Sequence, residues 1–245
     1  MARKPARNWH SPHAKGHDPH DEQGGEWLRD LILGGQDGLV NVLGLVLGVA
    51  TATQDARLII ISGLAAMFAE GISMGAVAYT SSKAALEFYD REKRREMDEI
   101  ERLPEEEREE VRRIYYAKGF RGKELEMVVQ KLTSNRERWL GVMMEEELKL
   151  FKDGESPLRS GIVVGIAALV GAVFPLIPFF LFPVQVAVEF TVPFSLVVLF
   201  VAGAIKGRFT KVVWWRSGIE LALIGIGAAL AGYLIGSWLG AAPGI

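Results

Sequence analysis

Charged and apolar residues occupy different parts of this 245-residue chain. Between Lys83 and Glu155 lie 20 of its 30 acidic residues and 17 of its 28 Lys and Arg residues. The segments on either side are almost uncharged and contain apolar stretches long enough to cross a bilayer as helices. We therefore predict an all-α membrane protein, in which five transmembrane helices carry a three-helix cytoplasmic insert between spans two and three.

The predicted boundaries follow this separation of charge. The polar N-terminal stretch has no periodicity and no apolar signal-peptide core, so we expect a disordered tail. The sequence contains no Pro between Leu58 and Leu103, which predicts that the second span continues as one helix to about Arg102. The predicted parts are the tail at residues 1–25, transmembrane helices one and two at 26–82, the insert at 83–155, and transmembrane helices three to five at 156–245.

Two more helices are expected in the insert. Pro104 should begin the first, because acidic residues follow it in the turn where they suit the positive end of the helix dipole. Gly119 fits the end of that helix, and a third helix is expected from about Gly122 to Lys152. The three later spans are expected at about residues 160–182, 191–205 and 213–240.

The first span contains a carboxylate within an apolar stretch. Asp37 lies inside residues 31–49, where a charge costs roughly 2.5 to 3.5 kcal/mol on insertion scales. Such a residue often lines a polar pathway or binds an ion, although Asp37 can also reach water from the helix end or bond to Asn41. In the second span, Glu70 and Met74 are four residues apart and share one helical face. A carboxylate beside a thioether favours a transition metal over Mg²⁺ or Ca²⁺, whereas a lone Met in a membrane helix is most often core packing.

Acidic and methionine side chains recur at helical spacing in the insert. Glu-x-x-Glu pairs place two carboxylates on one face of each of the first two helices, and a Met-Met-x-x-Glu stretch brings two thioethers within a turn of a carboxylate. Such a set could surround divalent cations, or it could form a solvated face with ordinary ion pairs. The candidate metal ligands are Glu96, Glu99, Glu107, Glu110, Met143, Met144 and Glu147.

The remaining metal-binding residue types are confined to the tail or absent. A histidine cluster can bind transition metals, and the biased composition of a solvated tail explains the same residues equally well. Without cysteine the chain forms no disulfide and no thiolate metal site. A net charge of −2 gives no sign of a nucleic-acid partner. The accessory candidates in the tail are His10, His13, His17 and His20.

The distribution of basic residues predicts the orientation. Five spans place the termini on opposite sides of the membrane. The tail, the insert and the basic loop at residues 206–211 fall on one side, and Arg57 is the only basic residue in the loops of the other. The positive-inside rule therefore predicts a cytoplasmic N-terminus and insert, with the C-terminus opposite. Without an organelle signal, we expect a prokaryotic plasma membrane.

Glycines at four-residue spacing predict smooth helix faces. They occur at Gly44 and Gly48 in the first span and at Gly232 and Gly236 in the last. Small residues at this spacing let membrane helices approach closely, either within the chain or between subunits.

The stretch from Asp37 to Asn41, the pair Ser73-Met74, the five spans and the Glu-rich insert together resemble the vacuolar iron transporter family. The resemblance covers nearly the whole chain after residue 26. It implies that Asp37 and Met74 line a metal pathway, and that the paired Glu residues and the Met-Met-x-x-Glu stretch of the insert bind metal.

The resemblance also implies a homodimer, with a pathway between the first two spans of each subunit. It implies export of Fe²⁺, and of Mn²⁺ as a second candidate, from the cytosol in exchange for protons. No permanently bound cofactor is expected. Zn²⁺ and Co²⁺ stay open as transported ions, because carboxylate–thioether sites follow the general affinity order.

The sequence departs from the family pattern in the second span. Many members carry Glu at the positions that Ala66 and Ala78 occupy here. Glu70, one turn before Met74, is the candidate for their role.

Two other functions were weighed against transport. A membrane-tethered di-iron oxidase of ferritin-like type would combine Glu with Glu-x-x-His motifs, but the insert contains no histidine. A membrane anchor whose insert docks a protein partner would need no metal. We favour a transporter rather than an enzyme.

Overall fold

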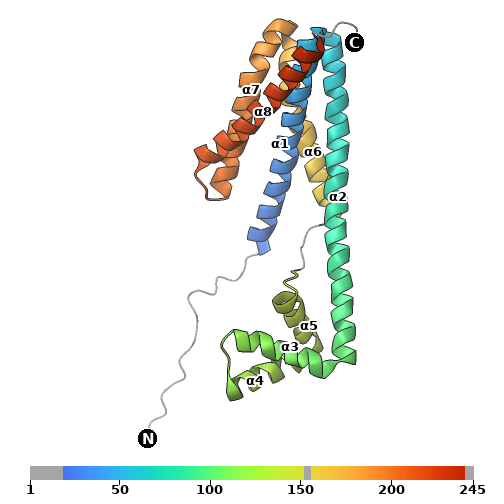
Figure 1. Ribbon diagram of the computed structural model, residues 1–245, viewed down its shortest axis with the longest axis vertical. Helices are drawn as coiled ribbons and strands as arrows, with labels where there is room; N and C mark the ends of the chain where they lie inside the picture. The colour runs from blue at the N-terminus through green and yellow to red at the C-terminus, as the bar shows by residue number, and fades with distance from the viewer. Residues whose placement is uncertain (1–18, 152–155, 241–245) are drawn as a thin grey trace. The chain divides into compact units, whose positions relative to one another are not determined.

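The computed structural model describes residues 19–151 and 156–240, and of residues 19–26 the backbone alone (Figure 1). The described residues form eight α-helices and one π-helical turn, without a strand. The chain divides into two compact units, of which unit 1 comprises Met1–Ala76 with Ser160–Ile245, and unit 2 comprises Val77–Arg159.

Five helices are long and apolar enough to span a membrane, as the sequence predicted. Each contains a window of high hydropathy, as a bilayer core requires. They are α1 (Pro19–Thr53), α2 (Ala56–Arg102), α6 (Pro157–Leu181), α7 (Val184–Phe209) and α8 (Trp214–Gly240).

In unit 1, α1 is the helix on which the others pack. Its buried side chains contribute to three apolar clusters, which also take residues from α2, α6, α7 and α8. Its glycines allow the neighbouring backbones to come close: a Cβ added at Gly38 would lie 2.1 Å from the carbonyl oxygen of Ala168 on α6. On the other side, Gly44 faces Gly232 of α8, so the glycine spacing serves close packing within the chain.

Unit 2 contains the second part of α2 and a set of shorter helices. They surround an apolar core that includes Ile100, Val111, Trp139 and the two methionines Met143 and Met144. Amphipathic helices of this length are stabilised mainly by burying one apolar face in such a core. The shorter elements are α3 (Pro104–Ala117), α4 (Gly122–Thr133), α5 (Arg136–Val142) and the π-helical turn η1 (Met143–Glu147).

The helix ends expected around the first loop of unit 2 agree with the structure. The second span continues as one helix to Arg102, and Pro104 lies in the first turn of α3. Gly119 follows the end of α3 with φ +104°, a conformation that side chains disfavour.

Two helices begin earlier than the sequence prediction. α1 begins at Pro19, inside the segment expected to be a tail. α7 begins at Val184 rather than near residue 191, so the segment expected as a loop forms helix and Pro193 lies inside α7. In a membrane helix the remaining backbone hydrogen bonds outweigh the one lost at an internal proline.

The single helix expected from Gly122 to Lys152 is also broken. α4 ends at Thr133, and α5 begins after Asn135. The Asn135 side chain accepts a hydrogen bond of 3.0 Å from the backbone N–H of Arg138, which caps α5. An Asn at this position stabilises a new helix start, so a cap and not a Gly or Pro divides the segment.

Candidate metal centre

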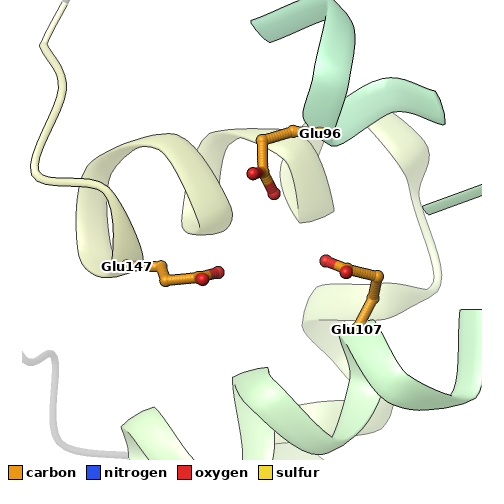
Figure 2. Close-up of side chains that lie close together, drawn as sticks. All are labelled: Glu96, Glu107 and Glu147. Carbon is orange, nitrogen blue, oxygen red and sulfur yellow. The ribbon is translucent and has the colours of Figure 1, made fainter. Parts of the chain in front are cut away.

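Three carboxylates of unit 2 point toward one another from three different elements (Figure 2). Glu96 comes from α2, Glu107 from α3 and Glu147 from the π-helical turn. One oxygen from each lies within 4.8 Å of the other two. Oxygens this close repel one another when ionised, and a divalent cation between them removes the repulsion.

Two of these carboxylates are buried with an unpaired oxygen. Glu96 is 1% exposed and Glu107 6%. The Oε2 atom of each has no hydrogen-bond partner among the described residues. A buried carboxylate oxygen normally binds a donor or a cation, so this arrangement is suited to receive a positive ligand.

The electrostatic cost of the cluster appears in the pKa values of its members. Burial raises the pKa of Glu107 to about 7, and the neighbouring Glu96 charge adds to the shift. Glu147 is an exposed residue, but its carboxylate points toward the buried Glu96 and Glu107. Loss of hydration there, together with the charge of Glu110, raises the pKa of Glu147 to about 7. Both groups therefore exchange protons near neutral pH.

Local structure explains how the carboxylates converge. Pro104 fixes the start of α3 and places Glu107 in its first turn. At the other end of unit 2, the backbone N–H of Leu148 bonds to the carbonyl oxygen of Met143 over 3.1 Å, the i to i−5 bond of a π-turn. Wide turns of this kind are frequent at functional sites, and this one carries Glu147.

The other predicted ligands of the insert lie around this cluster. Glu99 and Glu110 are half-buried, and the charge of each acts on Glu107. Glu110 also forms an ion pair of 2.8 Å with Arg113. Met143 and Met144 are buried in the apolar core of unit 2, so their role as thioether ligands stays a prediction.

In unit 1, Asp37 of α1 and Glu70 of α2 are brought together. Both are half-buried, and the Glu70 carboxyl makes side-chain hydrogen-bonding contacts with Asp37 and Asn41. Two carboxyl groups in contact need a shared proton or a cation between them. Met74 follows Glu70 by one turn and is half-buried, and its part in a metal pathway stays a prediction.

Two buried carboxylates escaped the sequence analysis. Asp30 is 2% exposed and accepts a hydrogen bond of 2.7 Å from the Ser160 hydroxyl of α6. Seven residues separate Asp30 from Asp37, a spacing that puts both on one face of α1 and could have revealed it. Glu92, one turn before Glu96, is also buried and forms ion pairs with two arginines.

The predicted histidine site falls largely outside the described part of the chain. His10, His13 and His17 lie outside the described residues, and His20 lies in the stretch of α1 whose side chains are not described. The accessory metal role of these four residues stays a prediction.

Fold and site together define a multi-pass helical membrane protein with a buried carboxylate cluster. The VIT family profile matches residues 28–237. The chain is 36% identical over 223 residues to vacuolar iron transporter 1 of Arabidopsis thaliana, covering 89% of each protein. It is 34% identical over 235 residues to vacuolar iron transporter 1 of Oryza sativa subsp. japonica, covering 95% of this chain and 92% of that protein.

A more distant relative extends the comparison beyond plants. The vacuolar iron transporter of Plasmodium berghei is 31% identical over 231 residues, covering 90% of this chain and 85% of its own length. The chain therefore belongs to the VIT family, as the residues quoted from its spans and insert indicated. Its relatives are transporters, which confirms the prediction that it is not an enzyme.

Proposed function

We propose that this protein exports Fe²⁺ from the cytosol in exchange for protons, with Mn²⁺ as a second substrate. The observation that carries the proposal is the convergence of Glu96, Glu107 and Glu147 in a member of an iron transporter family. Two buried oxygens of this cluster have no partner in the described structure, and a cation would supply one.

The cluster is the collecting site of the proposed transporter. Carboxylate oxygens bind divalent ions generally, and the nearby thioethers of Met143 and Met144 would favour first-row transition metals over Mg²⁺ and Ca²⁺. Because Glu107 and Glu147 have a pKa of about 7, protons and metal compete for the same oxygens near neutral pH.

The contact between Asp37 and Glu70 supplies the proposed exchange step. A cation and a proton can each relieve the repulsion between these carboxyl groups, so binding of one displaces the other. Alternating exposure of the pair to the two sides of the membrane would then couple metal efflux to proton entry. Met74 is the proposed third ligand, and Glu70 acts in place of the carboxylates missing at Ala66 and Ala78.

The basic residues of unit 1 support a cytosolic location for the α7–α8 turn. Four of the six Lys and Arg residues in its described part lie at or beside this turn. By the positive-inside rule, the turn faces the cytosol. Two spans, α6 and α7, separate this turn from the insert along the chain, so the insert is expected on the same side of the membrane. The four residues are Lys206, Arg208, Lys211 and Arg216.

We further propose that two copies form the working transporter. Asn41 is exposed although it contacts the half-buried Glu70, so the polar pair lies close to an open face of the chain. Asn41 also lines a groove of about 550 Å³ together with Gly44 and Gly48. A second copy covering this region would enclose the pathway in protein, as an intramembrane carboxylate requires.

The proposal is tested with purified protein in liposomes that contain a pH-sensitive dye. An inward Fe²⁺ or Mn²⁺ gradient should drive proton movement in the opposite direction, and Asp37→Asn should abolish this flux. Asp55→Asn is the matched control, because Asp55 is an exposed loop residue that caps α2. Full flux in the Asp37 variant would refute the pathway.

The same preparation tests the docking alternative. If the wild-type chain binds no divalent ion and moves no protons, the insert is better explained as a platform for a protein partner. Metal binding without flux would leave a storage or sensing role and would contradict transport.

A further inference from the structure

One guanidinium group lies among the carboxylates on the α2 side of the metal centre. Arg95 makes a hydrogen bond of 3.3 Å from Nη2 to Oε1 of Glu96. Its Nε lies 3.5 Å from Oε2 of Glu99, and its Nη1 lies 2.7 Å from Oε2 of Glu92. Arg95 thus touches two of the proposed metal ligands and one buried acid outside the cluster.

The two carboxylate oxygens of Glu96 have different surroundings. Oε1 accepts from Arg95, while Oε2 is buried without a partner. A divalent cation bound at Oε2 would therefore lie close to the positive charge of Arg95. Repulsion between the two charges lowers the affinity of the site for metal.

Arg95 has a partner that metal binding would leave in place. Its shortest ion pair is the one with Glu92, which is buried and which is also held by Arg91 over 2.9 Å. The guanidinium can therefore release Glu96 and Glu99 and keep a charge-assisted bond. An arginine suits this role, because its planar fork bonds to several carboxylates at once.

We propose that Arg95, whose side chain is about half exposed, is a built-in counter-cation, which occupies Glu96 and Glu99 when metal is absent and withdraws to Glu92 when metal binds. The inference rests on the proposed function of the cluster. It assigns a role to two residues outside the ligand set: Arg95 weakens metal binding, and Glu92 positions Arg95. The consequence is a site that releases its ion readily, as a collecting site in a transporter must.

The experiment measures Mn²⁺ binding to the full-length protein in detergent, from the electron paramagnetic resonance signal of free Mn²⁺ at pH 8. Arg95→Gln should bind Mn²⁺ roughly tenfold more tightly than the wild type, because one nearby charge is removed. Its thermal midpoint without metal should fall, since the carboxylates lose their counter-charge. A residue with only a structural role would lower both stability and affinity.

The matched control is Arg102→Gln. Arg102 lies on the same helix and pairs with Asp98 over 2.9 Å, and both residues are exposed. Loss of the same charge at this position should leave the Mn²⁺ affinity within about twofold of the wild type. Arg95→Lys keeps the charge but cannot bridge several carboxylates, so its affinity should lie between those of the wild type and Arg95→Gln.

A second variant tests the positioning role of Glu92 and should change the Mn²⁺ affinity in the opposite direction. Glu92→Gln removes the partner to which Arg95 withdraws, so Mn²⁺ should bind several-fold more weakly. In the Arg95→Gln background the same change should have little effect, and this non-additivity is the signature of an interaction through Arg95.

The outcomes separate the inference from the function beneath it. If the wild type binds no Mn²⁺, both the collecting site and the role of Arg95 are wrong. If the wild type binds Mn²⁺ and Arg95→Gln binds it equally or more weakly, the counter-cation alone is wrong. Equal effects of Glu92→Gln in both backgrounds would likewise overturn the positioning role.

Discussion

Glu107 shows how a single side chain can be costly to the fold and useful to the site. Its carboxylate is buried and one oxygen is unpaired. Burial, together with the charges of Glu96 and Glu110, raises its pKa to about 7. Ionisation of such a group opposes folding unless a cation binds. Removal of the charge should therefore have opposite effects on stability and on metal binding.

Glu107→Gln tests this expectation. At pH 8 the thermal midpoint of the metal-free protein should rise, because a buried and repelled charge is gone. Mn²⁺ affinity should fall at least about tenfold, since one of three converging ligands is lost. Glu106→Gln, at an exposed position beside it, should change both quantities much less, because its charge is the weakest of those that raise the pKa of Glu107. A lower midpoint for Glu107→Gln would show that the carboxylate has a partner that the described structure lacks.

The two raised pKa values also predict a pH dependence. An unperturbed Glu titrates near 4.5, whereas Glu107 and Glu147 titrate at about 7 in the folded chain. Between these values the folded state binds more protons than the unfolded state, so the free energy of unfolding falls as pH rises through this window. Metal binding must displace those protons, so Mn²⁺ affinity should increase from pH 6 to pH 8 and level off above. Calorimetric titration at several pH values measures it, and a flat profile would contradict the shifts.

For single residues, the sequence predicted which side chains could bind metal better than it predicted which side chains would be buried. Helical spacing brought out Glu96, Glu107 and Glu147, which the structure places together, because i,i+3 and i,i+4 positions share a face. It missed Asp30 and Glu92, because their burial depends on what other elements and the flanking arginines place beside them. The seven-residue spacing from Asp37 was a signal for Asp30, but spacing does not show that Ser160 of another helix bonds to it.

Among the elements, the α1–α8 contact depends closely on residue size. A Cβ at Gly236 would lie 2.2 Å from the carbonyl oxygen of Gly48, and one at Gly232 would lie 2.0 Å from that of Gly44. Backbone atoms cannot move away as flexible side chains can, so the helices would have to separate.

Gly236→Ala should therefore destabilise unit 1 by about 1–3 kcal/mol, the usual cost of overpacking. The thermal midpoint in detergent, followed by near-ultraviolet circular dichroism, measures the effect. Gly227→Ala on the same helix is the control, because a Cβ there meets nothing within 4 Å. That variant should be neutral or slightly stabilising, and equal losses for both would refute the packing argument.

The sequence predicted the helices better than their ends. Long apolar stretches can hardly form anything except helices in a bilayer, and Pro104 and Gly119 act through their own backbone preferences. The start of α7 was placed too late, at about residue 191, where Pro193 would fall in a first turn that suits proline; in the structure Pro193 lies inside α7. The break at Asn135 was missed because an Asn side chain caps a helix only where the chain has already left the preceding helix.

For the whole molecule, the separation of charge predicted an all-helical membrane protein, and the order of the spans followed from hydropathy. The assembly of the candidate metal centre could not be derived in the same way. It requires α2, α3 and the π-helical turn to converge on a shared apolar core, and such tertiary packing is not encoded in any one segment.

Because the proposed ligands come from three elements of unit 2, metal should stabilise this unit as a whole. Mn²⁺ at about one hundred times its dissociation constant should add roughly 2.7 kcal/mol to the free energy of unfolding of the part that binds it. Thermal unfolding with Mn²⁺ should show a higher midpoint than with a chelator, and at the same Mn²⁺ concentration the Glu107→Gln variant should lose at least about half of this difference. An equal gain in the variant would place the stabilising ion elsewhere.

The π-helical turn at Met143–Glu147 has a consequence for how such a centre can arise or disappear. A π-helical turn contains one residue more than an α-helical turn at the same place in the chain. Deletion of a single residue there would let the segment close into a regular α-helix of about 3.6 residues per turn. The apolar core should survive with small adjustments, while the carboxylate of Glu147 would shift relative to those of Glu96 and Glu107. A change of one residue in the length of this segment is therefore expected to alter how closely the three carboxylates converge.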